Sequence, residues 1–157
     1  MLIVCDKDYK ISGKLKIREE QAPYPNDEEV LIRVKSFGIN RPDLLQKKGL
    51  YPPPASASKI LGLECSGFAE KTGKNVKGIK EGDKVCALTA GGAYAEKVSV
   101  HQWHCFNIPK NLTFSEAAVL PEVFMTCWAN IFELGFLKQG DSIPVSYTHL
   151  RAHETLH

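Results

Sequence analysis

The 157-residue sequence predicts a mainly β domain with a few helices, an α+β fold. Short apolar or alternating runs recur through the first hundred residues, with turn residues between them. No long amphipathic helices alternate with these runs, as they would in a protein built around a parallel sheet. The last third of the chain changes to a helical pattern. Together these observations predict a barrel-like β domain with appended helices.

The predicted strands are short and follow one another closely. The strongest is 30–34, which is apolar except for Arg33 and rich in β-branched residues. Glycines at Gly82-Asp83 and Gly91-Gly92 supply turns between strands. The remaining strands are expected at 2–5, 15–18, 67–71, 84–88, 93–100 and 103–108.

One short helix is expected among the strands, over 41–49. Asn40 is a good N-cap residue, Pro42 fits the first turn and Gly49 ends the helix. The segment 51–54 that follows contains three prolines, so it forms a stiff extended stretch that cannot lie inside a sheet.

The last third contains two predicted helices. Thr113 and Glu116 fit a capping box, which predicts a helix over 114–120, and Pro121 fits the first turn of a second helix. The second helix carries an apolar stripe that is expected to pack in the core. The stripe is formed by Phe124, Trp128, Ile131 and Phe132.

Gly135 and Gly140 are expected to end the second helix, and 138–143 has the pattern of a turn that enters a new strand. In a protein with alternating strands and helices, this strand would continue into a Gly-rich turn and a further helix. The sequence instead continues without either to His157.

Composition restricts the possible functions. The chain has 20 Lys and Arg against 18 Asp and Glu, and a net charge of +2 argues against a dedicated nucleic-acid binder. We find no apolar run near the roughly 18 residues that a membrane span needs, and no signal peptide. The five cysteines contain no C-x-x-C pair, so we expect buried thiols rather than disulfides or structural zinc. A soluble, cytoplasmic protein is expected.

The C-terminal residues match a zinc-protease motif that we reject. His153, Glu154 and His157 form H-E-x-x-H, and His149 adds a third imidazole. No residues follow His157 to support a metal site, and a terminal residue frays easily. Residues 146–155 also resemble translated sequencing-library adaptor. We therefore expect 144–157 to be an artefactual tail, with a genuine unstructured tail as the alternative.

Three motifs carry a family resemblance. They are N-R-x-D at 40–43, Y-P-P-P at 51–54 and G-L-E-x-x-G at 62–67. In this order and spacing they resemble the medium-chain dehydrogenase/reductase superfamily, and most of all its zinc-free quinone oxidoreductases, the zeta-crystallin group. The resemblance covers about residues 1 to 143.

The resemblance implies a domain organisation. Residues 1–112 would form a GroES-like β-barrel catalytic domain. Residues 113–143 would supply helices and a first strand that lead toward a Rossmann domain, which is missing from this sequence. The apolar helix at 121–134 would then pack on that missing domain.

Two departures from the zinc-dependent members of the superfamily imply that no zinc is bound. Those enzymes have a metal-binding Cys where this chain has Asn40, and a His where it has Leu63. Asparagine is a poor zinc ligand and leucine cannot be one. We expect the neighbouring Glu64 to be a buried, hydrogen-bonded structural acid.

The resemblance also implies the site residues. Asn40 and Tyr51 would be catalytic, and Asn40 and Thr126 would bind the nicotinamide cofactor. Each has a plainer alternative: Asn40 caps a helix, Tyr51 packs against the prolines, and Thr126 bonds its own helix backbone. We expect Asp43 mainly to stabilise the first turn of its helix.

The implied activity is hydride or electron transfer from NADPH to a quinone or another electron-poor small molecule, in an enzyme that is a homo-oligomer when complete. No nucleic-acid or membrane partner is expected. The G-x-G-x-x-G turn that holds the cofactor's pyrophosphate is absent from the sequence, so the chain is expected to be a truncated, inactive enzyme. The alternatives are an enoyl-thioester reductase of the same superfamily and a non-catalytic GroES-like binding module.

Overall fold

The computed structural model describes residues 1–6 and 14–144. The chain divides into two compact units, Met1–Met125 and Thr126–His157, and each is described by itself. The H-E-x-x-H segment lies outside the described residues, so its interpretation stays a prediction. The predicted domain limits at residues 112 and 143 also stay predictions.

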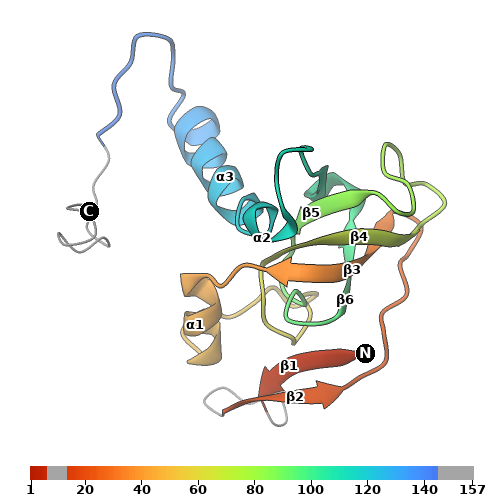
Figure 1. Ribbon diagram of the computed structural model, residues 1–157. Coiled ribbons are helices and arrows are strands. Elements are labelled where there is room, and N and C mark those ends of the chain that lie inside the picture. The colour runs from red at the N-terminus through yellow and green to blue at the C-terminus, as the bar shows by residue number, and fades with distance from the viewer. Residues whose placement is uncertain (7–13, 145–157) are drawn as a thin grey trace. The chain divides into compact units, whose positions relative to one another are not determined.

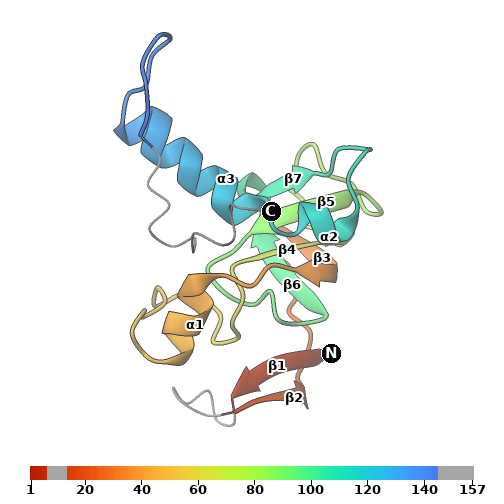
Figure 2. The ribbon, with the colours of Figure 1, turned by 60° about the vertical axis from the view of Figure 1, so that its left-hand side comes forward.

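The first unit is built around a five-stranded antiparallel sheet with the order β6-β3-β4-β5-β7. The sheet curls into a half-barrel, and β1 and β2 form a separate two-stranded ribbon (Figures 1 and 2). The mainly β, α+β fold predicted from the sequence is confirmed. The strands are β1 (Leu2–Asp6), β2 (Leu15–Glu19), β3 (Glu29–Phe37), β4 (Glu64–Thr72), β5 (Lys84–Leu88), β6 (Lys97–His101) and β7 (Cys105–Asn107).

The curl of the sheet arises where β3 pairs with β4. The register shifts twice along this pair, between Leu31 and Ile32 and between Val34 and Ser36, and such bulges bend a strand. Gly67 lies opposite Val34, and a Cβ on Gly67 would lie 2.1 Å from the carbonyl oxygen of Arg33. A glycine is therefore needed at this close approach of the two backbones.

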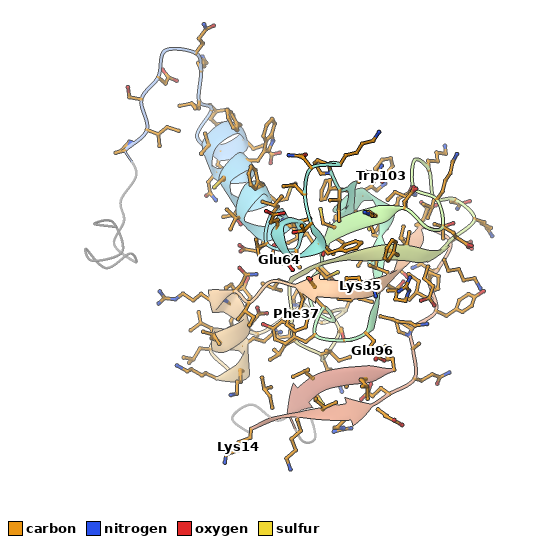
Figure 3. All side chains as sticks on the ribbon, viewed as in Figure 1. Lys14, Lys35, Phe37, Glu64, Glu96 and Trp103 are labelled. Carbon is orange, nitrogen blue, oxygen red and sulfur yellow. The ribbon has the colours of Figure 1, made fainter. Side chains whose placement is uncertain are left out.

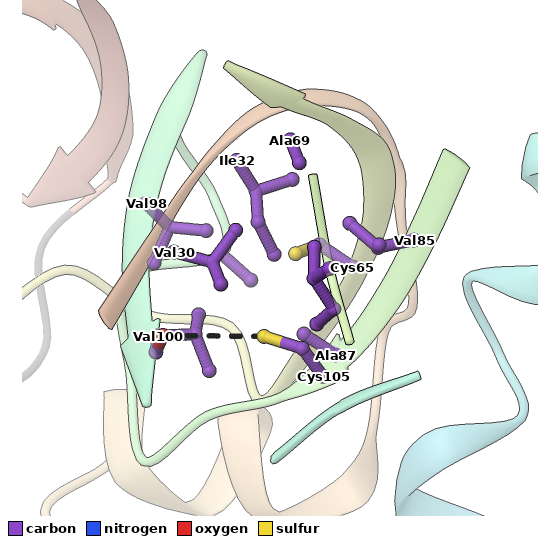
Figure 4. Close-up of a cluster of buried hydrophobic side chains, with 11 residues drawn as sticks. Val30, Ile32, Cys65, Ala69, Val85, Ala87, Val98, Val100 and Cys105 are labelled. Carbon is purple, nitrogen blue, oxygen red and sulfur yellow. Dashed lines mark hydrogen bonds between the residues drawn. The ribbon is translucent and has the colours of Figure 1, made fainter. Parts of the chain in front are cut away.

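The core fills the inside of the curled sheet (Figure 4). Val30 and Ile32, which share one face of β3, are fully buried in this core, and Leu31 between them is buried as well. The core has contributions from all five strands of the sheet. Its other labelled members are Cys65, Ala69, Val85, Ala87, Val98, Val100 and Cys105.

Two predicted strands are only half correct: β6 begins at Lys97 and not at residue 93, and the strand expected over 103–108 begins late as well. Gln102–His104 form a 3₁₀ turn, and β7 begins after it at Cys105. The cause is Gln102, which is buried and whose side-chain Oε1 accepts a hydrogen bond from the backbone N–H of Lys77 at 2.7 Å. Its backbone N–H donates to the carbonyl of Glu28 at 2.9 Å, so the chain turns inward at this point.

The helices begin where the sequence predicts but do not all end there. They are α1 (Arg41–Lys47), α2 (Phe114–Ala117) and α3 (Pro121–Trp128), and α3 continues as a π-helical segment, Ala129–Leu134, up to Gly135. The capping box is confirmed, since Glu116 N–H donates to Thr113 Oγ1 at 3.3 Å and Thr113 N–H donates to Glu116 Oε2 at 2.8 Å.

The second unit corrects two expectations. Phe124, which precedes it on α3, and Trp128 and Phe132 within it are 63%, 55% and 45% exposed, so the apolar stripe does not pack in a core. Residues 141–144 form irregular backbone and not a strand, because no described strand pairs with them.

The expectation that no apolar segment is long enough to span a membrane also needs correction. Phe114–Leu134 spans 21 residues with a mean hydropathy of 1.2, which is long and apolar enough to cross a membrane by length and composition. Length and composition alone are weak evidence, because a core helix of a soluble protein meets the same test.

Burial divides the five thiols into two classes. Cys5, Cys65, Cys86 and Cys105 are buried, as expected, and Cys127 is exposed. Burial, together with the nearby Cys86, raises the pKa of Cys105 to about 12. Burial also raises the pKa values of Cys65 and Cys86 above their ordinary range.

We therefore predict that a disulfide reagent modifies only Cys127 in the folded chain, because the other thiols are inaccessible. Thiol release measured by absorbance should give one fast equivalent, and the other four should react after denaturation. The variant Cys127→Ser should show no fast phase. Two or more fast equivalents would contradict the burial described here.

Candidate functional site

A buried polar cluster joins the start of α1 to β4 and to the segment before β6. We define it as Asn40, Asp43, Gly62, Glu64 and Tyr94. Asp43 and Glu64 are each 1% exposed, so two carboxylates are removed from solvent here. Burying a carboxylate without compensation costs several kcal/mol, so each needs hydrogen-bond donors.

Asp43 receives donors from three segments of the chain. Its Oδ2 accepts from the backbone N–H of Asn40 at 2.8 Å and from the Tyr94 hydroxyl at 3.0 Å. Its Oδ1 accepts from the backbone N–H of Gly62 at 3.2 Å. Asp43 therefore acts within its helix, as expected, and also holds together parts of the chain that lie 19 and 51 residues away in sequence.

Glu64 has the buried, hydrogen-bonded role that the sequence predicts. Its Oε1 accepts from Asn40 Nδ2 at 2.8 Å, and its Oε2 accepts from the backbone N–H of Glu122 at 2.9 Å. The N–H of Glu122 is one of the donors in the first turn of α3 that have no partner inside the helix. Glu64 thus binds Asn40 with one oxygen and the start of α3 with the other.

Gly38 leaves the space that the Glu64 carboxylate occupies. A Cβ on Gly38 would lie 2.1 Å from Glu64 Oε1, far inside contact distance. The backbone N–H of Gly38 also donates to the Glu64 carbonyl at 3.3 Å. Phe37, which precedes Gly38, lies at the same end of the sheet as Glu64 (Figure 3).

Tyr94 was not singled out from the sequence, yet it closes the cluster. Its ring packs on Phe37 with centroids 4.6 Å apart, and its hydroxyl donates to Asp43. Burial raises the pKa of Tyr94 above its ordinary value, and the adjacent Asp43 raises it further. The hydroxyl therefore stays protonated and keeps its role as a donor.

The structure places the three expected site residues in different surroundings. Asn40 is half-buried and belongs to the cluster. Tyr51 is 46% exposed in an irregular segment, and no described contact joins its side chain to Asn40. Thr126 is exposed on α3 in the second unit, where its carbonyl accepts from Asn130 Nδ2 at 2.8 Å. The catalytic and cofactor-binding roles of these residues stay predictions.

Two hollows open on the first unit, and of the cluster residues Tyr94 lines the first and none lines the second. One, of about 540 Å³, is lined by apolar side chains of β1, β2 and β3 and by Phe37 and Tyr94. The other, of about 520 Å³, lies near Ser58, Gly91 and His101. Asn40 and Tyr51 line neither hollow.

The donor set of the cluster suits a neutral polar group better than a metal. Among residues 1–6 and 14–144, no group of three or more His, Cys, Asp and Glu side chains could hold a metal ion. The amide of Asn40 offers both a donor and an acceptor, which matches the carboxamide of a nicotinamide or a substrate carbonyl. The chain's residues fit that end of a dinucleotide, whereas its sequence has no G-x-G-x-x-G turn for the phosphates.

Comparison with known proteins identifies the family. The model of the alcohol dehydrogenase GroES-like domain matches residues 26–110, more than half of the chain. The chain belongs to this family. It therefore carries the GroES-like domain of the medium-chain dehydrogenase/reductase superfamily, as the three motifs indicate.

The relatives are longer proteins. The mouse synaptic vesicle membrane protein VAT-1 homolog-like is 38% identical over 133 residues, which cover 85% of this chain and 32% of the relative. The chain thus spans about a third of the length of this relative. The crystal structure of its human counterpart has a TM-score of 0.77 at 35% identity, covering 89% of this chain and 45% of that one.

Two further solved structures bear on function. The Escherichia coli quinone oxidoreductase complexed with NADPH has a TM-score of 0.70 at 29% identity and covers 85% of this chain and 40% of its own. The CurK enoyl reductase has a TM-score of 0.77 at 27% identity and covers 89% and 45%. The GroES-like half is thus shared by reductases that act on different acceptors.

We predict that Tyr94→Phe lowers the free energy of unfolding by about 1.5–3 kcal/mol, the usual contribution of a hydrogen bond to a charged group. Denaturant unfolding measures this. Tyr24→Phe is the matched control, because Tyr24 is 76% exposed and its loss should change stability little. Equal effects of the two variants would contradict a role for Tyr94 in the cluster.

We also predict that the stability difference between wild type and Tyr94→Phe depends on pH. Because the folded chain holds the Tyr94 proton more tightly than the unfolded chain, this stability is complete below the ordinary tyrosine pKa of about 10. It is lost as the pH rises above that value. The stability difference between wild type and Tyr94→Phe should therefore shrink above about pH 10, and a constant difference would contradict the raised pKa.

Proposed function

We propose that the chain is the acceptor-side domain of a zinc-free, NADPH-dependent quinone oxidoreductase. The observation that carries the proposal is the amide of Asn40, which is fixed by a buried carboxylate at the position where zinc-dependent members of the superfamily have a metal-binding Cys. An amide cannot replace a zinc Lewis acid, but it can hold a carbonyl oxygen by a hydrogen bond. Leu63 in place of the metal-binding His supports the same conclusion.

In this proposal the chain's own residues bind and orient the acceptor. When bound, the nicotinamide supplies the hydride. Asn40 donates a hydrogen bond to the carbonyl of the acceptor and holds it for transfer. Tyr51, with an exposed ring and hydroxyl, contributes a face on which a flat quinone stacks. For Thr126, which belongs to the second unit, the proposal keeps the cofactor-binding role that the family resemblance implies.

The similarity to the Escherichia coli quinone oxidoreductase and its NADPH complex supports the choice of acceptor and cofactor. A second candidate, an enoyl-thioester reductase, is favoured by the similarity to the CurK enoyl reductase and by a fungal highly-reducing polyketide synthase that is 34% identical over 127 residues. Both reactions reduce an electron-poor system conjugated to a carbonyl, so the same Asn40 donor would serve either.

We predict that the 157-residue chain alone shows no micromolar binding of NADPH, because it has no G-x-G-x-x-G turn for the pyrophosphate. A fluorescence titration of NADPH into the folded chain measures this. Tight binding would contradict the assignment of only half a cofactor site to these residues.

The acceptor is tested on the product of the complete locus, found by sequencing the genomic DNA beyond Ile143. We predict that this product oxidises NADPH with 1,4-benzoquinone at a higher kcat/KM than with crotonyl thioester. The reverse order would favour the enoyl reductase. A folded product that oxidises NADPH with neither compound would overturn both, in favour of a binding module.

A further inference from the structure

The orientation of the Asn40 amide is fixed by a group that does not itself reach the surface. A side-chain amide has an oxygen on one side and a nitrogen on the other, and either can face a neighbour that both donates and accepts. Glu64 Oε1 accepts from Asn40 Nδ2 at 2.8 Å. Because a carboxylate only accepts, it selects the orientation in which the nitrogen of Asn40 faces inward.

Glu64 cannot shift to accommodate another orientation. It is 1% exposed, its Oε2 is held by the N–H of Glu122 at 2.9 Å, and Gly38 leaves just enough room beside its Oε1. Asn40 is held from its backbone side too, since its N–H donates to Asp43 at 2.8 Å. The amide therefore projects from a rigid base, as a group that must meet a small ligand in one geometry requires.

We propose that Glu64 is a positioning residue that fixes the Asn40 amide so that its second Nδ2 hydrogen donates to the carbonyl oxygen of the acceptor. This inference rests on the proposed function for the identity of the acceptor, but the orientation of the amide stands without it. Nδ2 carries two hydrogens, and Glu64 engages one of them. The other is the donor of this side chain that remains for a ligand.

The variant Glu64→Gln should reverse the orientation of the Asn40 amide. The N–H of Glu122 needs an acceptor, so the oxygen of a glutamine at this position stays with Glu122 and its NH₂ group faces Asn40. Asn40 must then turn its oxygen inward. The change preserves the size of the side chain and removes the hydrogen bond that Asn40 Nδ2 donates to residue 64.

The orientation is measured in the 157-residue chain by NMR of the asparagine side-chain amides. We expect one Nδ2 proton of Asn40 to exchange with solvent at least about tenfold more slowly than those of the exposed Asn111, because a hydrogen bond to a buried carboxylate protects it. Glu64→Gln should abolish this protection, and the exposed Glu81→Gln should leave it unchanged. An unprotected Asn40 amide in wild type would overturn the proposal.

A double variant that exchanges the donor and the acceptor of this hydrogen bond distinguishes a positioning role of Glu64 from a purely stabilising one. It also provides a test if Glu64→Gln alone does not fold. In Asn40→Asp combined with Glu64→Gln, the glutamine NH₂ donates to the new carboxylate, so the hydrogen bond is restored with donor and acceptor exchanged. Residue 40 then has no hydrogen to offer. We expect the swap to recover most of the stability lost in Asn40→Asp alone.

In the complete protein the swap should still lose kcat/KM for 1,4-benzoquinone by about 100-fold, as removal of a donor at a reacting carbonyl does. Recovery of both stability and kcat/KM would show a purely structural pair and overturn the proposal. Absence of quinone reduction in the wild-type complete protein would refute the proposed function alone, because the NMR experiment tests the orientation of Asn40 independently.

Discussion

Two buried carboxylates in the chain's first unit, both joined by hydrogen bonds to Asn40, constrain the segments that supply their donors. Asp43 and Glu64 are almost completely removed from solvent, and each is stable there only because donors from separate segments replace its hydration. Those donors are the backbone of Asn40, Gly62 and Glu122, the amide of Asn40 and the hydroxyl of Tyr94. The start of α1, the start of β4, the loop before β6 and the start of α3 are therefore held together by charge compensation, while the apolar core fills the sheet.

This arrangement links stability to function. A core of valines and small side chains holds the half-barrel, but it does not specify where a polar group must point. The buried carboxylates do, because hydrogen bonds are directional and a carboxylate accepts only. The half-buried Asn40 amide, which we propose to contact the acceptor, is therefore held in one orientation by the Glu64 carboxylate.

Local pattern predicted most of the fold. The apolar, β-branched run at 30–34 predicts a strand, and its Val30 and Ile32 lie in the core. The Thr113–Glu116 box predicts the start of a helix. The burial of Glu64 is also predicted, from its place after Leu63, which stands where the zinc-dependent relatives have a metal-binding His. The partners of Asp43 were not, because Tyr94 lies 51 residues away and only the folded chain brings the two together. The prediction that the apolar stripe with Phe124 and Trp128 packs in the core is wrong, because periodicity shows that a helix face is apolar but not what covers it.

The central claim is that the Glu64 carboxylate accepts a hydrogen bond from the side-chain nitrogen of Asn40. A scalar coupling across that hydrogen bond, measured by NMR in the isotope-labelled chain, tests it most directly. The account predicts a correlation between Asn40 Nδ2 and the side-chain carboxyl carbon of Glu64. A correlation through a hydrogen bond from Asn40 Nδ2 to a carbonyl or carboxyl carbon of any residue other than Glu64 would contradict it; the one-bond correlation with the carbonyl carbon of Asn40 itself is present in either case.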